Sequence, residues 1–122
     1  MSTRLRALRG ATSVADDTPA AIEAATTELL EEILSRNSIV AEDLVSLIFT
    51  STPDLTSAFP ATAARGLGLG GVPLLCAQEI PVPGALPRCI RVLIHLYTDR
   101  DYASLRHVYL GEARRLREDL PQ

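Results

Sequence analysis

The chain has 122 residues, of which 47% are apolar and 22% charged, and its formal net charge is −3 at pH 7. That length is too short for a multidomain enzyme, so we expect a single domain over residues 1–122. The acidic balance, the 4% aromatic content and the absence of a basic stripe argue against nucleic-acid binding. No apolar run reaches the roughly 18 residues of a membrane span, and the first residues lack a signal peptide's apolar segment, so we expect a cytoplasmic protein that binds no membrane.

The first predicted elements are a strand and a long helix. Residues 5–14 are short and alternating enough for a strand, in which Gly10 marks either a close backbone approach or a bulge. Thr18 then offers a side-chain N-cap for a helix, and Asp17 suits the positive end of the helix dipole. We expect this helix to end at Asn37 and to cover one face of a sheet. Its apolar stripe consists of Ile22, Ala25, Leu29 and Ile33.

The middle of the chain alternates between strands and short connections. Residues 45–51 are typical of a buried strand, and residues 59–67 predict a short helix. The glycines at 66–71 precede a strand rather than a helix, so they form a loop and not a phosphate-binding motif. That strand is expected over residues 72–78. Three prolines make residues 81–87 a stiff connection that neither a helix nor a central strand tolerates.

Residues 89–98 form the clearest strand because their alternation is regular. We expect one set of side chains to face the helix-covered core: Ile90, Val92, Ile94 and Leu96. Arg91 therefore projects onto the opposite face, where a guanidinium must reach solvent or bind an anion. The mostly polar residues 102–120 predict no firm element beyond an arginine-rich turn or short helix after residues 107–110.

The charged residues are unevenly distributed, and they are the candidates for chemistry. Residues 16–43 contain eight acidic residues and one arginine, whereas residues 88–117 contain seven arginines and three acidic residues. The second half can therefore bind an anion. No nucleophile motif or metal-ligand cluster is present, and the two cysteines, at 76 and 89, are expected to be free thiols. Each remaining candidate is, considered alone, more typical of a surface ion pair: Arg9, Arg65, Glu79, Arg91 and Arg117.

Seven short blocks of sequence form a pattern when taken together. They are RGAT at 9–12, TPDL at 52–55, AFPA at 58–61, CAQE at 76–79, CIRV at 89–92, RHVYL at 106–110 and LR at 116–117. In order and spacing they resemble the AroH-class monofunctional chorismate mutases, over nearly the whole chain. The resemblance implies an α+β fold, a mixed β-sheet with a long covering helix, assembled as a trimeric pseudo-α/β barrel with active sites at the subunit interfaces. It also implies isomerisation of chorismate to prephenate in phenylalanine and tyrosine biosynthesis, without metal or cofactor.

The resemblance also implies roles for individual residues. Arg91 is the cation at the ether oxygen of the substrate, and Glu79 accepts a hydrogen bond from the ring hydroxyl. Arg9 binds the side-chain carboxylate, assisted by the hydroxyl of Tyr109. Phe59 and Leu116 are implied as apolar walls, and Arg65 and Arg117 as peripheral basic groups, so that the substrate-binding residues are Leu75, Cys76, Ala77, Gln78, Phe59, Arg65, Leu116 and Arg117.

The sequence departs from the family at two positions. Thr62 stands where some relatives carry a basic side chain near the pocket mouth, and Leu75 replaces a residue that is often small or polar.

Two alternative functions share the implied architecture: a non-enzymatic trimeric small-molecule-binding module and a Rid-like imine deaminase. Fold alone does not choose among these functions. The combination of Arg9, Glu79, Arg91 and Tyr109 favours the mutase.

Overall fold

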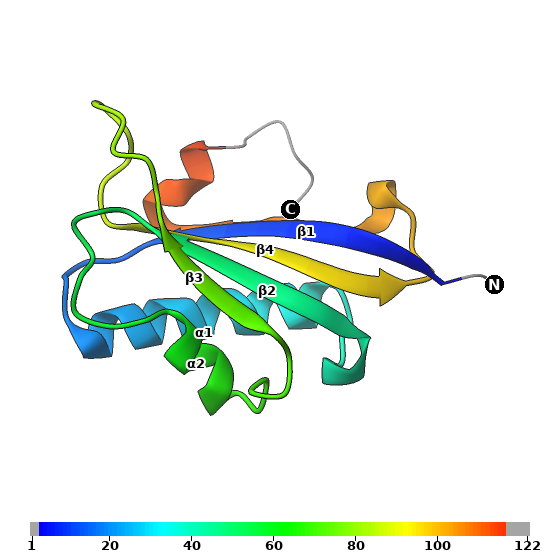
Figure 1. Ribbon diagram of the computed structural model, residues 1–122. Helices are drawn as coiled ribbons and strands as arrows, with labels where there is room; N and C mark the ends of the chain where they lie inside the picture. The colour runs from blue at the N-terminus through cyan, green and yellow to red at the C-terminus, as the bar shows by residue number, and fades with distance from the viewer. Residues whose placement is uncertain (1–2, 117–122) are drawn as a thin grey trace.

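A five-stranded mixed sheet forms the centre of the computed structural model, which describes residues 3–116 (Figure 1). The strands are β1 (Arg4–Ser13), β2 (Leu44–Ser51), β3 (Leu74–Gln78), β4 (Cys89–Thr98) and β5 (Val108–Leu110). Their order is β3-β2-β4-β1-β5, with β4 antiparallel to both neighbours, β3 parallel to β2 and β5 parallel to β1. The helices are α1 (Pro19–Arg36) and α2 (Ala61–Gly66), with 3-10 turns η1 (Ala41–Asp43), η2 (Tyr102–Ser104) and η3 (Gly111–Arg115). None of the helices within residues 3–116 could cross a membrane.

The ends of α1 confirm the predicted caps. The Thr18 side chain accepts a hydrogen bond from the backbone N–H of Ala21 at 3.1 Å, and Asn37 is the C-cap, with its backbone N–H donating to the Ile33 carbonyl. The mixed sheet with its covering helix confirms the predicted α+β fold of the single chain. β5 was not predicted, because three residues are too few to show a strand's alternation.

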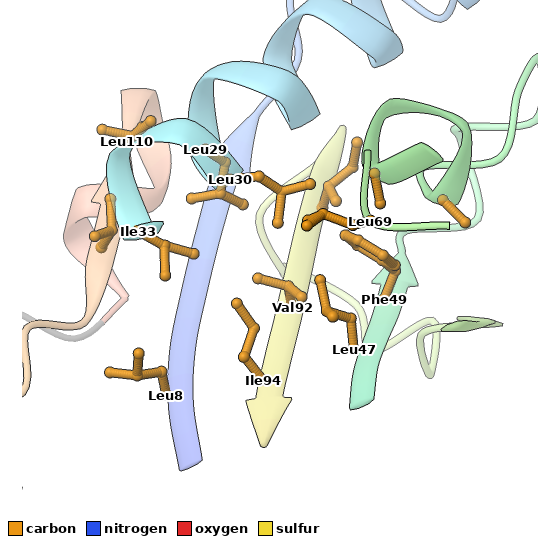
Figure 2. Packing of buried hydrophobic residues seen from close by; sticks show 14 of the residues in the cluster. Leu8, Leu29, Leu30, Ile33, Leu47, Phe49, Leu69, Val92, Ile94 and Leu110 are labelled. Carbon is orange, nitrogen blue, oxygen red and sulfur yellow. The ribbon is translucent and has the colours of Figure 1, made fainter. Parts of the chain in front are cut away.

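The core lies between the sheet and the two α-helices, which cover the same face (Figure 1). The alternation predicted for β4 is confirmed, because Ile90, Val92, Ile94 and Leu96 are all buried. Figure 2 shows the leucine and isoleucine side chains of α1 reaching toward Val92 of β4, with Phe49 and Leu47 of β2 beside it. The inward residues of β4 thus belong to one buried cluster with residues of α1 and α2.

Gly10 is a close approach and not a bulge. The pairing of β1 with β4 runs without interruption through the Gly10–Val92 pair. A Cβ atom at this glycine would lie 2.6 Å from Cδ1 of Ile33 and 3.2 Å from Cγ1 of Val92. Because both atoms belong to the packed core, α1 can rest this closely on β1 only where the strand has no side chain.

The opposite face of the sheet is mostly open. The alternate residues of β1 and β4 project from it, and both α-helices lie on the other side (Figure 1). One corner is covered by η3, through a small cluster of Ala11, Cys89, Tyr109 and Ala113. Large apolar side chains elsewhere on this open face are exposed to solvent, namely Leu5, Leu75, Leu93 and Tyr97.

Replacing Gly10 with alanine should destabilise the fold by about 1–3 kcal/mol, because the added methyl group must displace Ile33. Gly66→Ala is the matched control, since a Cβ there meets nothing within 4 Å. Urea denaturation at one fixed protein concentration should give a lower midpoint for Gly10→Ala and an almost unchanged midpoint for Gly66→Ala. Equal midpoints for Gly10→Ala and the unmodified protein would show that α1 does not depend on this approach.

Candidate functional site

A hollow of about 410 Å³ on the open face brings together three of the residues selected from the sequence, Arg9, Arg91 and Tyr109. Its floor is made of two rows of residues that run across the sheet. One row contains Thr50 of β2, Arg91 of β4, Ala11 of β1 and Tyr109 of β5, which pair directly with one another in that order. Residues paired in this way project from the same face. Ala11, which stands between Arg91 and Tyr109 in this row, is small and also lines the hollow.

The second row lies next to the first and contains Ile48, Leu93 and Arg9. The backbone N–H of Arg9 donates a 3.0 Å hydrogen bond to Nδ1 of His107, which ties β1 to the residue just before β5. Arg9 and Arg91 are the charged groups among the described residues that line the hollow. The hollow therefore has an apolar floor and two cations, a combination that suits an anion with an apolar body.

Glu79 holds Arg91 in place from outside the hollow. The Nε atom of Arg91 lies 3.0 Å from Oε2 of Glu79, and the hydroxyl of Thr50 donates to the same oxygen at 2.7 Å. The backbone N–H of Glu79 donates to the carbonyl of Ser51, which continues the pairing of β3 with β2. The Arg91 side chain is 44% exposed and that of Glu79 15% exposed, so the ion pair adds little stability. Its effect is to orient the two side chains.

The contact leaves other polar atoms of this pair available. It uses Nε of Arg91 and Oε2 of Glu79, and neither Nη atom of the guanidinium nor Oε1 of the carboxylate takes part. The pair can therefore donate hydrogen bonds to one part of a ligand through Nη1 and Nη2, and accept a hydrogen bond from another part through Oε1.

A second hollow, of about 400 Å³, contains four other predicted substrate-binding residues: Phe59, Cys76, Ala77 and Gln78. It lies between the end of β3 and the connection from β2 to α2, and no residue lines both hollows. Phe59 is 71% exposed. Leu75, which is 59% exposed, lines neither hollow but pairs with Ile48 of the first one.

Asp17 fixes the connection that carries Phe59. Its carboxylate accepts hydrogen bonds from the backbone N–H and hydroxyl groups of both Thr56 and Ser57, at 2.7 to 3.1 Å. These bonds, the Ser57 hydroxyl first among them, lower the pKa of Asp17. The carboxylate was expected at the helix dipole of α1. It contacts this connection because four donors there satisfy the charge.

The remaining predicted residues lie at the edges of the site. Leu116 packs against the cluster under η3, beside Tyr109. Arg65 is exposed on α2 and lines neither hollow, and Thr62 is exposed on the same helix. Arg117 lies outside the described residues. Within residues 3–116, no group of three or more His, Cys, Asp or Glu side chains could hold a metal ion.

Comparison with known proteins identifies the family. A family model described as chorismate mutase type I matches residues 5–120. The chain belongs to this family. It is 57% identical over 117 residues to the chorismate mutase AroH of Thermus thermophilus, covering 95% of this chain and 96% of that protein. It is 44% identical over 117 residues to the chorismate mutase AroH of Bacillus subtilis strain 168, covering 95% and 92%.

A solved structure agrees with the sequence comparisons. The chorismate mutase from Clostridium thermocellum superimposes with a TM-score of 0.88 and is 48% identical, covering 89% of this chain and 97% of that one. The resemblance to chorismate mutases predicted from the seven sequence blocks is therefore confirmed, as is the α+β fold. Membership of this family favours the mutase over the binding module and the imine deaminase.

Two residues of the chorismate mutase fold were missed from the sequence. Thr50 lies within a segment predicted simply as a buried strand. Side chains alternate between the two faces of a strand, and counting in steps of two from Ser46 places Thr50 on the open face. Asp17 was assigned to the helix N-terminus, and nothing in the sequence pairs it with the distant Thr56 and Ser57. Both contacts depend on tertiary structure.

Proposed function

We propose that the protein is a chorismate mutase, which isomerises chorismate to prephenate in the biosynthesis of the aromatic amino acids. The observation that carries this conclusion is the placement of Arg9 and Arg91 at one apolar-floored hollow, in a chain that matches the family over residues 5–120. Chorismate is a dicarboxylate with an apolar ring, so its charge and shape suit this hollow.

The reaction requires no covalent bond between the protein and the substrate. It is a unimolecular rearrangement in which an ether carbon–oxygen bond breaks while a carbon–carbon bond forms, and no proton has to be transferred. The enzyme must hold the enolpyruvyl side chain folded over the ring, which removes part of the entropic barrier. It must also stabilise the negative charge that gathers on the ether oxygen as the carbon–oxygen bond breaks.

Arg91 supplies that stabilisation in our proposal. Its Nε is held by Glu79, so the two Nη groups are presented in a fixed direction before the substrate binds. Because charge on the ether oxygen is larger in the transition state than in the substrate, these donors bind the transition state more strongly. This difference in binding lowers the barrier.

The other polar groups orient the substrate. Oε1 of Glu79 accepts a hydrogen bond from the ring hydroxyl, and Arg9 binds the carboxylate of the side chain together with the hydroxyl of Tyr109. These roles are supported by the position of Arg9 and Tyr109 in the hollow and of Glu79 against Arg91.

We propose further that the site is completed by a second copy of the chain, in a homotrimer with active sites at the subunit interfaces. Two observations support this. The second hollow, which contains Phe59 and residues 76–78, shares no lining residue with the first, and the open face exposes large apolar side chains such as Leu5, Leu93 and Tyr97. A neighbouring copy that covers this face would bring its residues 75–78 and Phe59 to the first hollow, with Arg65, Leu116 and Arg117 at the rim.

The cytoplasmic location and the absence of a cofactor stay predictions.

Arg91→Ala should lower kcat at least about 100-fold, because one preorganised donor to a developing oxyanion is lost. Arg91→Lys should also be impaired, because lysine keeps the charge without the fork that Glu79 orients. The loss of chorismate's ultraviolet absorbance measures both. Arg36→Ala, which removes an exposed arginine paired with Glu32 on α1, should keep the unmodified rate.

Three results would contradict this proposal. An unmodified protein that binds chorismate without converting it would support the binding module, and one that converts imines but not chorismate would support the deaminase. An Arg91→Ala variant as fast as the unmodified protein would remove Arg91 from the mechanism.

If each active site is formed by two subunits, mixing two inactive variants should restore part of the mutase activity. Arg91→Ala damages one half of each site, and Phe59→Asp places a carboxylate in the other half, where it repels the dianion. In trimers refolded from an equal mixture, about a quarter of the sites combine two intact halves and should recover activity. A mixture no more active than the average of its components, or an equilibrium mass equal to one chain, would contradict shared sites.

A further inference from the structure

Thr50 contacts the catalytic pair at the one atom where the two side chains meet. Its hydroxyl donates to Oε2 of Glu79 at 2.7 Å, and Nε of Arg91 reaches the same oxygen at 3.0 Å. Thr50 and Arg91 are direct cross-strand partners on β2 and β4, and both line the first hollow. A hydroxyl, a carboxylate and a guanidinium from three different segments thus share one oxygen.

This arrangement determines which nitrogen atoms of Arg91 remain available. An arginine and a carboxylate can also pair through two parallel hydrogen bonds, and such a pair consumes one or both Nη groups. The Thr50 hydroxyl occupies part of the acceptor capacity of Oε2 and fixes the edge of the carboxylate that faces Arg91. Arg91 then meets the carboxylate through Nε, and neither Nη group is used in the contact with Glu79.

We propose that Thr50 is a positioning residue of the active site, which holds Glu79 in the orientation that reserves the Nη groups of Arg91 for the substrate. Thr50 acts through Glu79. The inference rests on the proposed function for the identity of the substrate, whereas the hydrogen-bond geometry stands independently of it.

A structural role alone does not require the hydroxyl. Valine is also β-branched, is nearly the same shape and suits a strand at least as well as threonine. Thr50→Val should therefore keep β2 folded and remove only the hydrogen bond to Glu79. Ser46→Ala is a matched control, because it deletes a hydroxyl from the open face of the same strand, where Ser46 contacts Nδ1 of His95 at 3.0 Å, outside the hollow.

Steady-state kinetics with chorismate tests the proposal. Thr50→Val should lower kcat about 10-fold with KM within about threefold of the unmodified value, because orientation matters most in the transition state. Thr50→Ser, which restores the hydroxyl, should recover most of the rate, and Ser46→Ala should keep it. In the background of Glu79→Gln, Thr50→Val should cause almost no further loss, since both changes act on one carboxylate.

Any of four kinetic results would overturn the proposal. The first two are an unchanged kcat in Thr50→Val and no recovery of kcat in Thr50→Ser. The other two are an equal loss of kcat in Ser46→Ala and losses from Thr50→Val and Glu79→Gln that multiply in the double variant. A crystal structure of Thr50→Val gives a readout that does not depend on activity. Arg91 should there pair with Glu79 through at least one Nη atom, and an unchanged contact through Nε alone would overturn the positioning role. If the unmodified protein fails to convert chorismate, the proposed function fails, and this structure still decides the role of Thr50.

Discussion

The proposed function of this site depends on one contact, between Nε of Arg91 and Oε2 of Glu79. The contact is too exposed to stabilise the fold appreciably, but it fixes the direction of a guanidinium before any ligand arrives. A charge that is already oriented need not be reorganised as the reaction proceeds, and so it stabilises developing charge at low cost. The same contact uses Nε of Arg91 and Oε2 of Glu79 and leaves the other donors and acceptors of the pair for the proposed substrate.

The packed core on the opposite side of the sheet fixes the position of the backbone that carries Arg91. The residues on either side of Arg91, Ile90 and Val92, are buried against the helix-covered core, so the backbone of β4 cannot shift without disturbing packed side chains. Gly10 contributes by letting α1 lie close to β1, next to the strand that carries Arg91. Ala11 contributes a small side chain to the lining of the hollow, between Arg91 and Tyr109 in the row. One face of the sheet provides rigidity, and the other carries the side chains of the candidate site.

Alternation and capping predicted most of the fold, because both are local properties of the chain. The pattern of β4 predicted which face Arg91 occupies, and the caps of α1 were identified from Thr18 and Asn37. The contacts of Arg91 with Glu79 and of Thr50 with Glu79 could not be predicted from local patterns. Glu79 directly follows β3 at the edge of the sheet, and its partners lie on β2 and β4, so the contacts depend on the order of the strands. Asp17 illustrates the same limit, because its partners are about forty residues away in sequence. The roles of the individual site residues came from the family resemblance and not from any local pattern.

The central claim is that Arg91 binds the ether oxygen of the substrate. The most direct test is a crystal structure of the protein with a stable dicarboxylate that is shaped like the folded substrate and retains its bridging ether oxygen. The account predicts that an Nη atom of Arg91 lies within hydrogen-bond distance of that oxygen while Nε still contacts Glu79. A bound ligand with its ether oxygen against any other group, or an Arg91 side chain turned away from the hollow, would contradict it.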